Sequence, residues 1–320
     1  WLDELVDYNP IRLEQMWQII TAALNPGRFY NKCVIFYSQD GNNGKGTLGQ
    51  VLKNIIGESL YSSVNIKNFG VRFRTQQLLG KILNIADENP VGAYIDATDE
   101  FKAAITGDDI QIEAKGKDAY PMQVRILNIQ MLNGPLLTKD KSNSIYRRLL
   151  IIPFTHTFTG QERTYIKHDY MNRTEVKEYI LKRALEAPIV TEFLVTNENT
   201  EALYQTKLEN NSVIEFLDEF LLEFKWAVLP TKFLYELYKA WMASDNSIGK
   251  PVKKSVFIEY ASDFFNQLPD WKVRLAQNDK ITVNGRMDTD EPLITEYNLT
   301  AYMDPNYRGT DPKLQRAFPR

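Results

Sequence analysis

The chain has 320 residues, a formal net charge of −3 and a sequence pI near 5.7. This length predicts two or three domains with a sizeable core, and 43% hydrophobic with 25% charged residues is typical of a soluble globular protein. The acidic balance argues against binding nucleic acid over a broad basic face, although it is compatible with a local basic element such as a positive hairpin.

Composition also limits metal and redox chemistry. Cys33 is the only cysteine, which excludes intramolecular disulfides and cysteine metal clusters and favours a reducing, cytoplasmic location. The two histidines, His156 and His168, make a histidine-based zinc site unexpected. No apolar run approaches the ~20 residues of a membrane span, so we expect no membrane partner. The chain opens on Trp1 without a signal-peptide pattern, and we expect it to be cut from a longer protein with an upstream domain.

Residues 1–28 predict an N-terminal helical segment, because apolar residues recur at helical spacing before Asn25-Pro26-Gly27 ends the pattern. From residue 29 to 172 strands alternate with helices, which predicts an α/β core in which helices cover a sheet. Strands are expected at 33–38, 61–66, 81–86, 125–132 and 149–154, and helices at 46–57, 73–79 and 97–106. The alternating segment 110–123 predicts a β-hairpin that carries Lys115 and Lys117.

A glycine-rich turn follows the first strand of this core and precedes a helix. A strand, a turn with Gly44-Lys45 and a helix are the layout of a phosphate-binding loop, in which backbone N–H groups cradle phosphates and the lysine reaches the β- and γ-phosphates. Gln39 stands where glycine is usual, and Gly46 stands where serine or threonine is usual. The hydroxyl expected to hold Mg²⁺ is therefore one place late, at Thr47. The residues expected to bind nucleotide are Gly41, Asn42, Asn43, Gly44, Lys45, Gly46 and Thr47.

A pair of carboxylates ends a later strand of the core. Asp87 and Glu88 follow the mostly apolar segment 82–86. An ATPase needs such a pair beside its phosphate-binding loop, because one carboxylate holds Mg²⁺ and the other orients the attacking water. We assign Asp87 to the metal and Glu88 to the water, although two acidic residues at a strand end are also common.

Polar residues flank two further strands. Asn133 ends the strand at 125–132, where an amide could touch the γ-phosphate or position water. Arg147 and Arg148 precede the strand at 149–154, which could aim one guanidinium at the nucleotide of a neighbouring subunit. Each feature alone also suits an ordinary turn or surface.

The rest of the chain predicts helices and a small domain. Residues 173–228 predict a helical segment, and residues 229–302 predict a winged-helix-like domain, in the order helix, helix, hairpin. The two hairpin strands are expected at 271–275 and 280–283. Residues 303–320 predict a tail. Three lysines at the start of the second helix suit phosphate contacts and solvated surface equally well: Lys250, Lys253 and Lys254.

The order and wording of these segments resemble the superfamily 3 helicase domain of phage and plasmid primases, and look like the C-terminal part of a phage primase–polymerase. The resemblance covers roughly residues 1–225 and is weaker from 229 to 300. No single segment is diagnostic, but their shared order is specific. The matching segments are Asn43-Gly44-Lys45-Gly46-Thr47, Leu79-Gly80-Lys81, Ala86-Asp87-Glu88, Ile105-Thr106-Gly107-Asp108-Asp109, Lys115-Gly116-Lys117-Asp118, Asn133-Gly134-Pro135 and Arg147-Arg148 with the strand that follows.

The resemblance implies an AAA+-like P-loop core in a hexameric ring that hydrolyses ATP with Mg²⁺ between subunits. It implies translocation on single-stranded DNA at a fork, a covalently linked upstream primase or polymerase domain, and the host cell's cytoplasm if the source is viral. By this resemblance Lys45 contacts phosphate, Asp87 and Glu88 serve Mg²⁺ and water, Asn133 is the sensor, Arg147 or Arg148 is a finger in trans, and Lys115 and Lys117 grip DNA in the pore.

Two other functions are compatible with parts of the sequence. In one, the ring binds nucleotide only to assemble, and clamps a primase–polymerase on DNA with little unwinding. In the other, the chain is a small-molecule P-loop kinase, which does not account for the Lys115 hairpin or the arginine pair. Gly116 stands where the family's hairpin often has an aromatic residue, which argues against base stacking at the tip.

Overall fold

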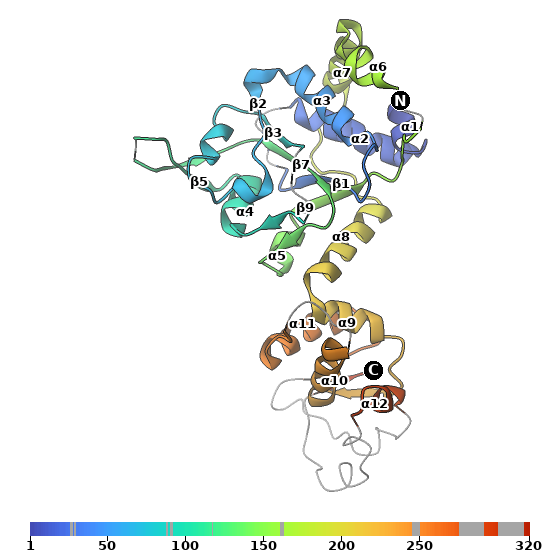
Figure 1. The fold of residues 1–320 in the computed structure, drawn as a ribbon. Helices are drawn as coiled ribbons and strands as arrows, with labels where there is room; N and C mark the ends of the chain where they lie inside the picture. The colour runs from blue at the N-terminus through green and yellow to red at the C-terminus, as the bar shows by residue number, and fades with distance from the viewer. Residues whose placement is uncertain are drawn as a thin grey trace. The chain divides into compact units, whose positions relative to one another are not determined.

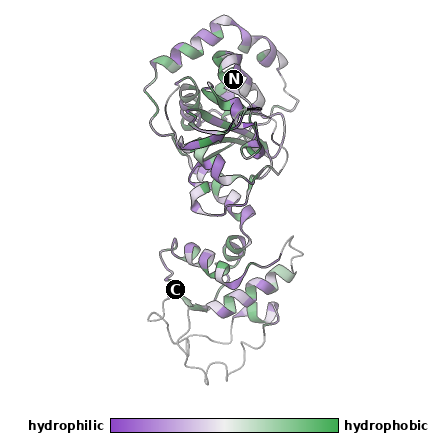
Figure 2. Cartoon of the chain, turned by 90° about the vertical axis from the view of Figure 1, so that its left-hand side faces the viewer, coloured by the Kyte–Doolittle hydropathy of each residue, from purple (hydrophilic) through white to green (hydrophobic). Residues whose placement is uncertain are grey.

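The structure is a computed structural model that describes residues 1–25, 28, 30–87, 89, 92–116, 118–160, 163–244, 250–274, 291–299 and 317–320. The chain divides into two units, Trp1–Asn210 and Asn211–Arg320, both drawn in Figure 1. In Figure 2 the helices of both units carry both hydrophobic and hydrophilic residues, as amphipathic helices do when one face is buried. Among the described residues, no helix is both long and apolar enough to span a bilayer.

A parallel sheet of five strands forms the centre of the first unit, in the order β2-β3-β7-β1-β9 (Figure 1). Because β7 lies between β1 and β3, the carboxyl end of β7 separates the carboxyl ends of the other two. All five strands fall within or next to the segments expected from the sequence, and the α/β core is confirmed. The strands are β1 (Cys33–Ser38), β2 (Tyr61–Ser62), β3 (Leu83–Ala86), β7 (Leu127–Asn133) and β9 (Leu149–Pro153).

Both faces of this sheet are buried. Val34 and Phe36 of β1 face a core that α2 (Pro10–Ala23), α3 (Lys45–Ile56) and α7 (Thr174–Glu186) help to form. Cys33 and Ile35 face a second core on the other side, to which α4 (Thr98–Thr106) contributes. Burial on two faces explains why the strands have nearly continuous apolar sequences.

Strand β2 is shorter than the segment 61–66 expected from the sequence. The backbone of Val64 pairs with the side chain of Asn84, whose Oδ1 accepts from the Val64 N–H at 2.7 Å and whose Nδ2 donates to the Val64 carbonyl at 2.8 Å. These bonds replace the backbone ladder, so β2 ends at Ser62.

The remaining elements of the first unit are short, apart from one helix. The helix α8 (Asn197–Asn210) is fastened to β9 by Asn199, whose Nδ2 donates to the Ile151 carbonyl at 2.9 Å. The expected hairpin is present as β5 (Asp109–Ile112) and β6 (Tyr120–Gln123), and the helix expected at 73–79 is a 3₁₀ turn. The others are α1 (Leu2–Leu5), α5 (Asn143–Tyr146), α6 (Thr164–His168), η1 (Glu58–Leu60), η2 (Ile66–Asn68), η3 (Thr75–Leu78), η4 (Tyr170–Asn172) and the parallel pair β4 (Tyr94–Ile95) and β8 (Leu137–Thr138).

The second unit is built around aromatic side chains. The ring of Phe216 on α9 (Ser212–Phe220) lies 5.2–6.3 Å, between centroids, from the rings of Phe220, Tyr238, Trp241 and Phe257. Because α9 packs here, the division between the units falls between residues 210 and 211, inside the segment 173–228 that was expected to be helical. The elements are α9 (Ser212–Phe220), β10 (Val228–Pro230), α10 (Thr231–Ser244), α11 (Lys254–Phe265), α12 (Pro292–Glu296) and β11 (Ala317–Pro319).

The expected wing is covered by the structure only in part. The helices α10 and α11 occur in the expected order, whereas the second hairpin strand, at 280–283, lies outside the described residues. Of the first strand, Arg274 forms an isolated antiparallel bridge with Ala317.

The chain end departs from the expected tail. Ala317–Pro319 pairs antiparallel with β10, and Phe318 is fully buried with its ring 4.6 Å from that of Phe265. The segment 303–320 is rich in proline, glycine and charged residues, and little in its sequence indicated that the apolar pair Ala317-Phe318 would be buried. These last residues therefore belong to the core of the second unit.

Replacing this buried ring tests that assignment. Phe318→Ala should lower the free energy of unfolding of the second unit by about 3–5 kcal/mol, the usual cost of deleting a buried phenyl ring. Urea unfolding of the whole chain, followed by tryptophan fluorescence, measures it. Leu222→Ala is the matched control, because Leu222 is 87% exposed, and should change stability by less than about 0.5 kcal/mol. Equal stability of the two variants would contradict a core role for the chain end.

Candidate functional site

The glycine-rich turn joins β1 to α3 in a conformation that only certain residues allow. Asn42 and Gly44 have φ values of 57° and 83°, in the left-handed region. A Cβ on Gly44 would lie 2.5 Å from Leu5 Cδ1 and 3.3 Å from Phe158 Cε2, so the position requires glycine. Gly44 immediately precedes the first residue of α3, which points the free N–H groups of the helix into the turn.

Lys45 lies at the start of α3 and is only 5% exposed. Its Nζ donates to the Leu132 carbonyl at 3.0 Å, to Asn133 Oδ1 at 2.7 Å and to Ser38 Oγ. Burial lowers the pKa of Lys45 to about 8. The ammonium group therefore joins the ends of β1 and β7, and the structure brings together two of the residues expected at the site, Lys45 and Asn133.

Two residues that sequence reasoning missed hold this lysine and the turn. Ser38 ends β1, and its hydroxyl accepts from Lys45 and donates to the Asp40 carbonyl at 2.7 Å. The Nδ2 of Asn43 donates to the same hydroxyl and to the Asp40 carbonyl at 2.6 Å. The available signal was a small hydroxyl residue at the last position of an apolar strand.

Thr47 and Gly46 follow Lys45 on α3, and neither shares the contacts of the lysine. Thr47 lines a cavity of about 170 Å³ whose walls include Phe158, Ile166 and His168. Two residues apart on a helix, Thr47 and Lys45 project about 200° apart around the axis. A Cβ on Gly46 would meet no atom within 4 Å, so the missing hydroxyl is not a consequence of packing.

Asp87 follows β3 and is the described member of the expected carboxylate pair, since Glu88 lies outside the described residues. Its side chain is 44% exposed, and Oδ2 forms a 2.9 Å ion pair with Lys53 Nζ on α3. Lys53 was missed by sequence reasoning, because pairing across the α3–β3 contact follows from the fold. The register pairs Ser38 with Asn133 across β1 and β7, so Asn133 lies between the turn and the end of β3.

The side chains at this edge of the sheet limit how a divalent metal ion could bind. In the described part of the chain, no group of three His, Cys, Asp or Glu side chains could hold a metal ion. Mg²⁺ is usually bound through one or two carboxylates together with substrate phosphates, rather than by a full protein cage. Asp87 follows β3 at the same edge of the sheet as the glycine-rich turn, and its single carboxylate fits this mode.

The arginine pair lies at the opposite edge of the sheet. The Cys33 N–H at the start of β1 donates to the Arg148 carbonyl at 2.7 Å, so both arginines precede the strands whose far ends carry Lys45. The length of β1 separates the edges by roughly 17 Å. Arg148 is half-buried and donates to the Ser144 carbonyl at 2.6 Å and to Ser144 Oγ at 2.9 Å, whereas Arg147 is exposed.

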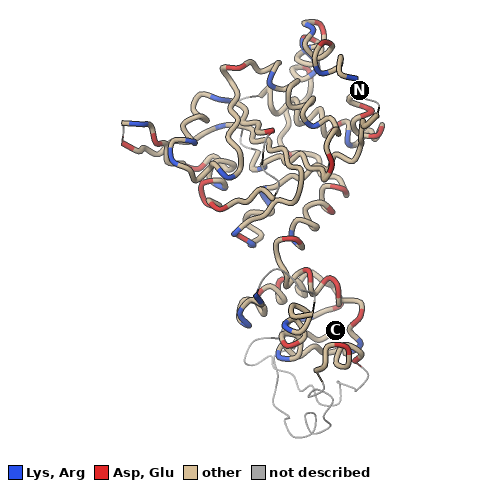
Figure 3. The backbone as a smooth tube through the Cα atoms, viewed as in Figure 1, with Lys and Arg blue, Asp and Glu red and all other residues tan. Residues whose placement is uncertain are grey.

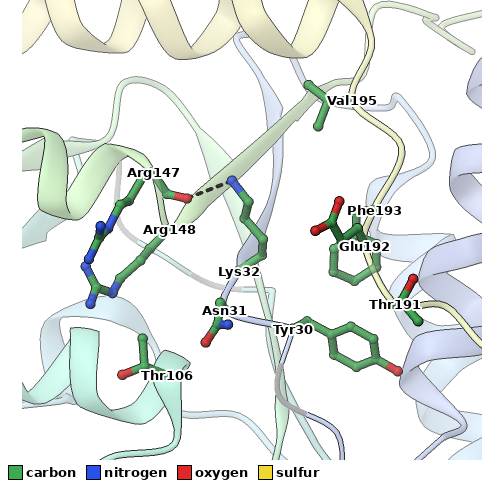
Figure 4. Close-up of a pocket in the computed structure, with 10 residues that line it drawn as sticks. All are labelled: Tyr30, Asn31, Lys32, Thr106, Arg147, Arg148, Thr191, Glu192, Phe193 and Val195. Atoms are coloured by element: carbon green, nitrogen blue, oxygen red, sulfur yellow. Dashed lines mark hydrogen bonds between the residues drawn. The ribbon is translucent and has the colours of Figure 1, made fainter.

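Both arginines line a cavity of about 580 Å³ (Figure 4). The Nζ of Lys32 donates to the Arg147 carbonyl at 2.7 Å, the bond drawn in Figure 4, and burial lowers the pKa of this lysine. Thr191, Glu192, Phe193 and Val195 line the opposite wall, and Glu192 is the acidic side chain among the lining residues. The cavity is therefore mainly cationic.

The β5–β6 hairpin projects from the first unit and carries both basic and acidic residues (Figure 3). Lys115 is exposed near its tip, and Lys117 lies outside the described residues. A loop that sequence reasoning missed adjoins the hairpin, because Arg72 Nε lies 2.8 Å from Glu113 Oε2. In this loop Phe73 is 38% exposed at φ 65°, with its ring 5.2 Å from the Arg72 guanidinium.

Two family models match separate parts of the chain. Residues 36–148 match a family of unknown function (DUF5906); this range runs from within β1 to the arginine pair that precedes β9. Residues 208–284 match the family described as Poxvirus D5 protein-like.

Solved structures with a similar fold include the C-terminal region of NrS-1. One apo structure of this region, residues 305–718, matches with a TM-score of 0.54 at 16% identity, covering 86% of this chain and 72% of that one. Another apo form matches with a TM-score of 0.53 at 16% identity, covering 73% of this chain and 63% of that one, less than two thirds. The JCV helicase matches at a TM-score of 0.36 and 14% identity, too slight a likeness to indicate a shared fold. The resemblance found in the sequence is therefore borne out at the level of the fold, by the NrS-1 C-terminal region, and by the Poxvirus D5 protein-like match over residues 208–284.

Proposed function

We propose that the chain is an ATP-dependent, ring-shaped DNA helicase module of a phage or plasmid replication primase–polymerase, which hydrolyses ATP between subunits and translocates on single-stranded DNA. One observation carries the proposal: Lys45 meets Asn133 at one edge of the sheet, while Arg147 lies at the other edge, out of reach of the same chain's turn. A site split in this way is complete only when a second copy supplies the arginine.

The turn from Gly41 to Thr47 is the phosphate-binding element. Lys45 exchanges Ser38 and Asn133 for the β- and γ-phosphates, which match its charge, and Asn133 is left to contact the γ-phosphate or the attacking water. The helix N-terminus of α3 adds backbone donors. The cavity lined by Thr47 and Phe158 lies on the other side of this helix start and takes the ribose and base.

Asp87, which pairs with Lys53 at 2.9 Å, would hold Mg²⁺. The metal would supply positive charge to neutralise the charge that develops on the phosphates. Glu88 orients the attacking water. Thr47 projects into the cavity with Phe158, so we assign it to the ribose side rather than to the metal, in revision of the role expected from the sequence.

Arg147 is the finger in trans. Its side chain is exposed, whereas Arg148 is held by Ser144. Lys32 fixes the backbone of Arg147 and adds positive charge to the same cavity. A guanidinium placed by a neighbour at the γ-phosphate stabilises the charge of the transition state.

The hairpin and the loop beside it form the DNA contact. Lys115 and Lys117 meet backbone phosphates, and Arg72 and Phe73 add a charge and a stacking face next to them. A hexamer repeats these few cations around a pore, which reconciles DNA binding with a net charge of −3. Single-stranded and fork DNA are the expected substrates, and an upstream primase or polymerase domain is the expected covalent partner.

The second unit contributes a winged-helix-like domain. Its helices α10 and α11 have the expected order, and the exposed Lys250, Lys253 and Lys254 lie at the start of α11. We assign these lysines to phosphate contacts.

A ring scaffold is the second candidate. Gly46 favours it, because a site without the usual hydroxyl could bind nucleotide for assembly and hydrolyse it slowly. Strand displacement with ATP and with a non-hydrolysable analogue distinguishes the two functions, since only a motor requires hydrolysis.

Removing the lysine tests the motor directly. Lys45→Ala should abolish ATP hydrolysis and strand displacement while the chain remains folded, because no other described group replaces the ammonium at the phosphates. Phosphate release, fork unwinding and circular dichroism measure the three properties. Normal turnover in this variant would sink the motor hypothesis, and equal displacement with ATP and analogue in the unaltered protein would favour the scaffold.

The low pKa of Lys45 predicts a pH dependence of nucleotide affinity. The lysine is mostly charged at pH 7 and mostly neutral above its pKa of about 8, so the Kd for ADP should rise up to about tenfold per pH unit beyond that point. Calorimetry at pH 7 and pH 9.5 measures it. Lys45→Arg keeps its charge and should bind with little pH dependence. A flat profile in the unaltered protein would contradict the role of this ammonium.

Mixed subunits test the finger in trans. Arg147→Ala and Lys45→Ala should each be inactive alone, and an equal mixture should recover hydrolysis at about a quarter of its interfaces, where an intact turn meets an intact arginine. Arg148→Ala is the control, and should keep most activity because Arg148 is held within its own chain. A mixture as inactive as its components would rule out a shared site.

A further inference from the structure

Four amide side chains form a connected group in the sheet, which we call the amide cluster: Asn84, Asn89, Asn128 and Gln130. Asn84, Asn128 and Gln130 are at most 1% exposed. The Nδ2 of Asn84 donates to Asn128 Oδ1 at 3.1 Å, Gln130 Nε2 donates to the same oxygen at 2.8 Å, and Asn89 Nδ2 donates to Gln130 Oε1 at 3.0 Å. A continuous chain of hydrogen bonds therefore crosses β3 and β7.

Burying amides here has a cost that apolar residues would avoid. An unpaired amide in an apolar interior is unfavourable by about 1–3 kcal/mol, and the strands of a parallel sheet are normally filled with aliphatic side chains. The cluster is almost fully paired, but the buried Nδ2 of Asn128 donates to no partner. Because this one donor has no partner among the described residues, the hydrogen bonds of the cluster could rearrange into a second pattern.

The amide cluster binds the backbone of the segment after β2, which forms no backbone hydrogen-bond ladder with any described strand. Asn84 pairs with both backbone groups of Val64, and Gln130 Nε2 also donates to the Val64 carbonyl at 3.1 Å. Asn89 Oδ1 accepts from the Ile66 N–H at 3.1 Å. The path of the chain between β2 and η2 is thus fixed by these side chains.

One end of the cluster reaches the nucleotide edge of the sheet. Asn89 lies two residues after Asp87, and its Nδ2 also donates to the Ala86 carbonyl at 3.4 Å and to the Met131 carbonyl at 3.2 Å. Met131 is two residues before Asn133, the partner of Lys45. A shift of the ends of β3 and β7 therefore acts on Asn89 first.

The other end leads to the DNA side. Ile66 begins η2, and the chain runs from there to the loop that carries Arg72 and Phe73. The ion pair between Arg72 and Glu113 connects that loop to the hairpin. The turn η3, which follows the loop, is also connected to the hairpin, because Thr75 Oγ1 donates to the Gln111 carbonyl at 3.1 Å.

We propose that Asn89 and Gln130 are positioning residues that link the nucleotide edge of the sheet to the DNA-contacting loop. The proposal rests on the function proposed above and names how its two sites communicate. Binding at Lys45 and Asn133 moves the end of β7, Asn89 follows, and the Ile66 end of the loop segment moves with it. Neither residue touches the nucleotide or the DNA.

The test compares ATP hydrolysis with and without single-stranded DNA in Asn89→Ala. Basal turnover should stay within about twofold of the unaltered protein, whereas stimulation by DNA should fall at least about fivefold, the lower end of typical coupling between sites. Ser63→Ala is the matched control. Its hydroxyl donates to the Ile85 carbonyl at 2.9 Å, in the same segment but outside the cluster, so its stimulation should be unchanged.

A second variant and a second measurement keep the test decisive if Asn89→Ala misfolds. Gln130→Met keeps nearly the same volume, removes the bonds to Asn89 and Val64, and should give the same loss of stimulation. Hydrogen exchange of residues 64–74 should respond to nucleotide in the unaltered chain and not in either variant.

The outcomes separate this proposal from the function on which it rests. If the unaltered protein neither hydrolyses ATP nor responds to DNA, the proposed function fails. If it does both and the two folded variants keep full stimulation, the coupling role is overturned. Loss of basal turnover in folded Asn89→Ala would also overturn it, by making Asn89 part of the nucleotide site itself.

Discussion

The arrangement depends on one buried ammonium group. Lys45 is held where the ends of β1 and β7 meet the start of α3, by Ser38, the Leu132 carbonyl and Asn133. A charge with 5% exposure is tolerable there only because each of its donors has a partner. The strand order, with β7 between β1 and β3, sets Asn133 beside the lysine and places it between the glycine-rich turn and the end of β3, which Asp87 follows.

Much of the fold follows from local patterns. Each central strand is an apolar run that follows a turn, and burial on both faces made those runs long enough to recognise in the sequence. The end of β2 could not be predicted, because Asn84 and Asn89 replace the backbone ladder from positions 20 and 23 residues away. The chain end was misjudged for a similar reason, since Phe318 gains its partners only when the second unit is assembled.

The candidate site divides in the same way. Lys45 and Asn133 could be placed together from the rule that parallel strands end at one edge of a sheet. Ser38 and Lys53 could not, because their partners are set by the packing of α3 on the sheet. The orientation of Thr47 also needed the structure, since sequence spacing gives the order of residues along α3 but not the side of the helix on which the neighbouring elements leave a cavity.

The packing around Gly46 leaves this position open to substitution in evolution. Nothing within 4 Å would meet a Cβ at this position, and its φ is not in the left-handed region. Steric selection therefore does not keep glycine there, in contrast to Gly44, which is locked by Leu5 and Phe158. The two glycines on either side of the lysine are thus under opposite constraints. Gly44 is fixed by the packing of the unit, whereas Gly46 is an open position at which a single substitution could place a hydroxyl next to the lysine without disturbing the fold.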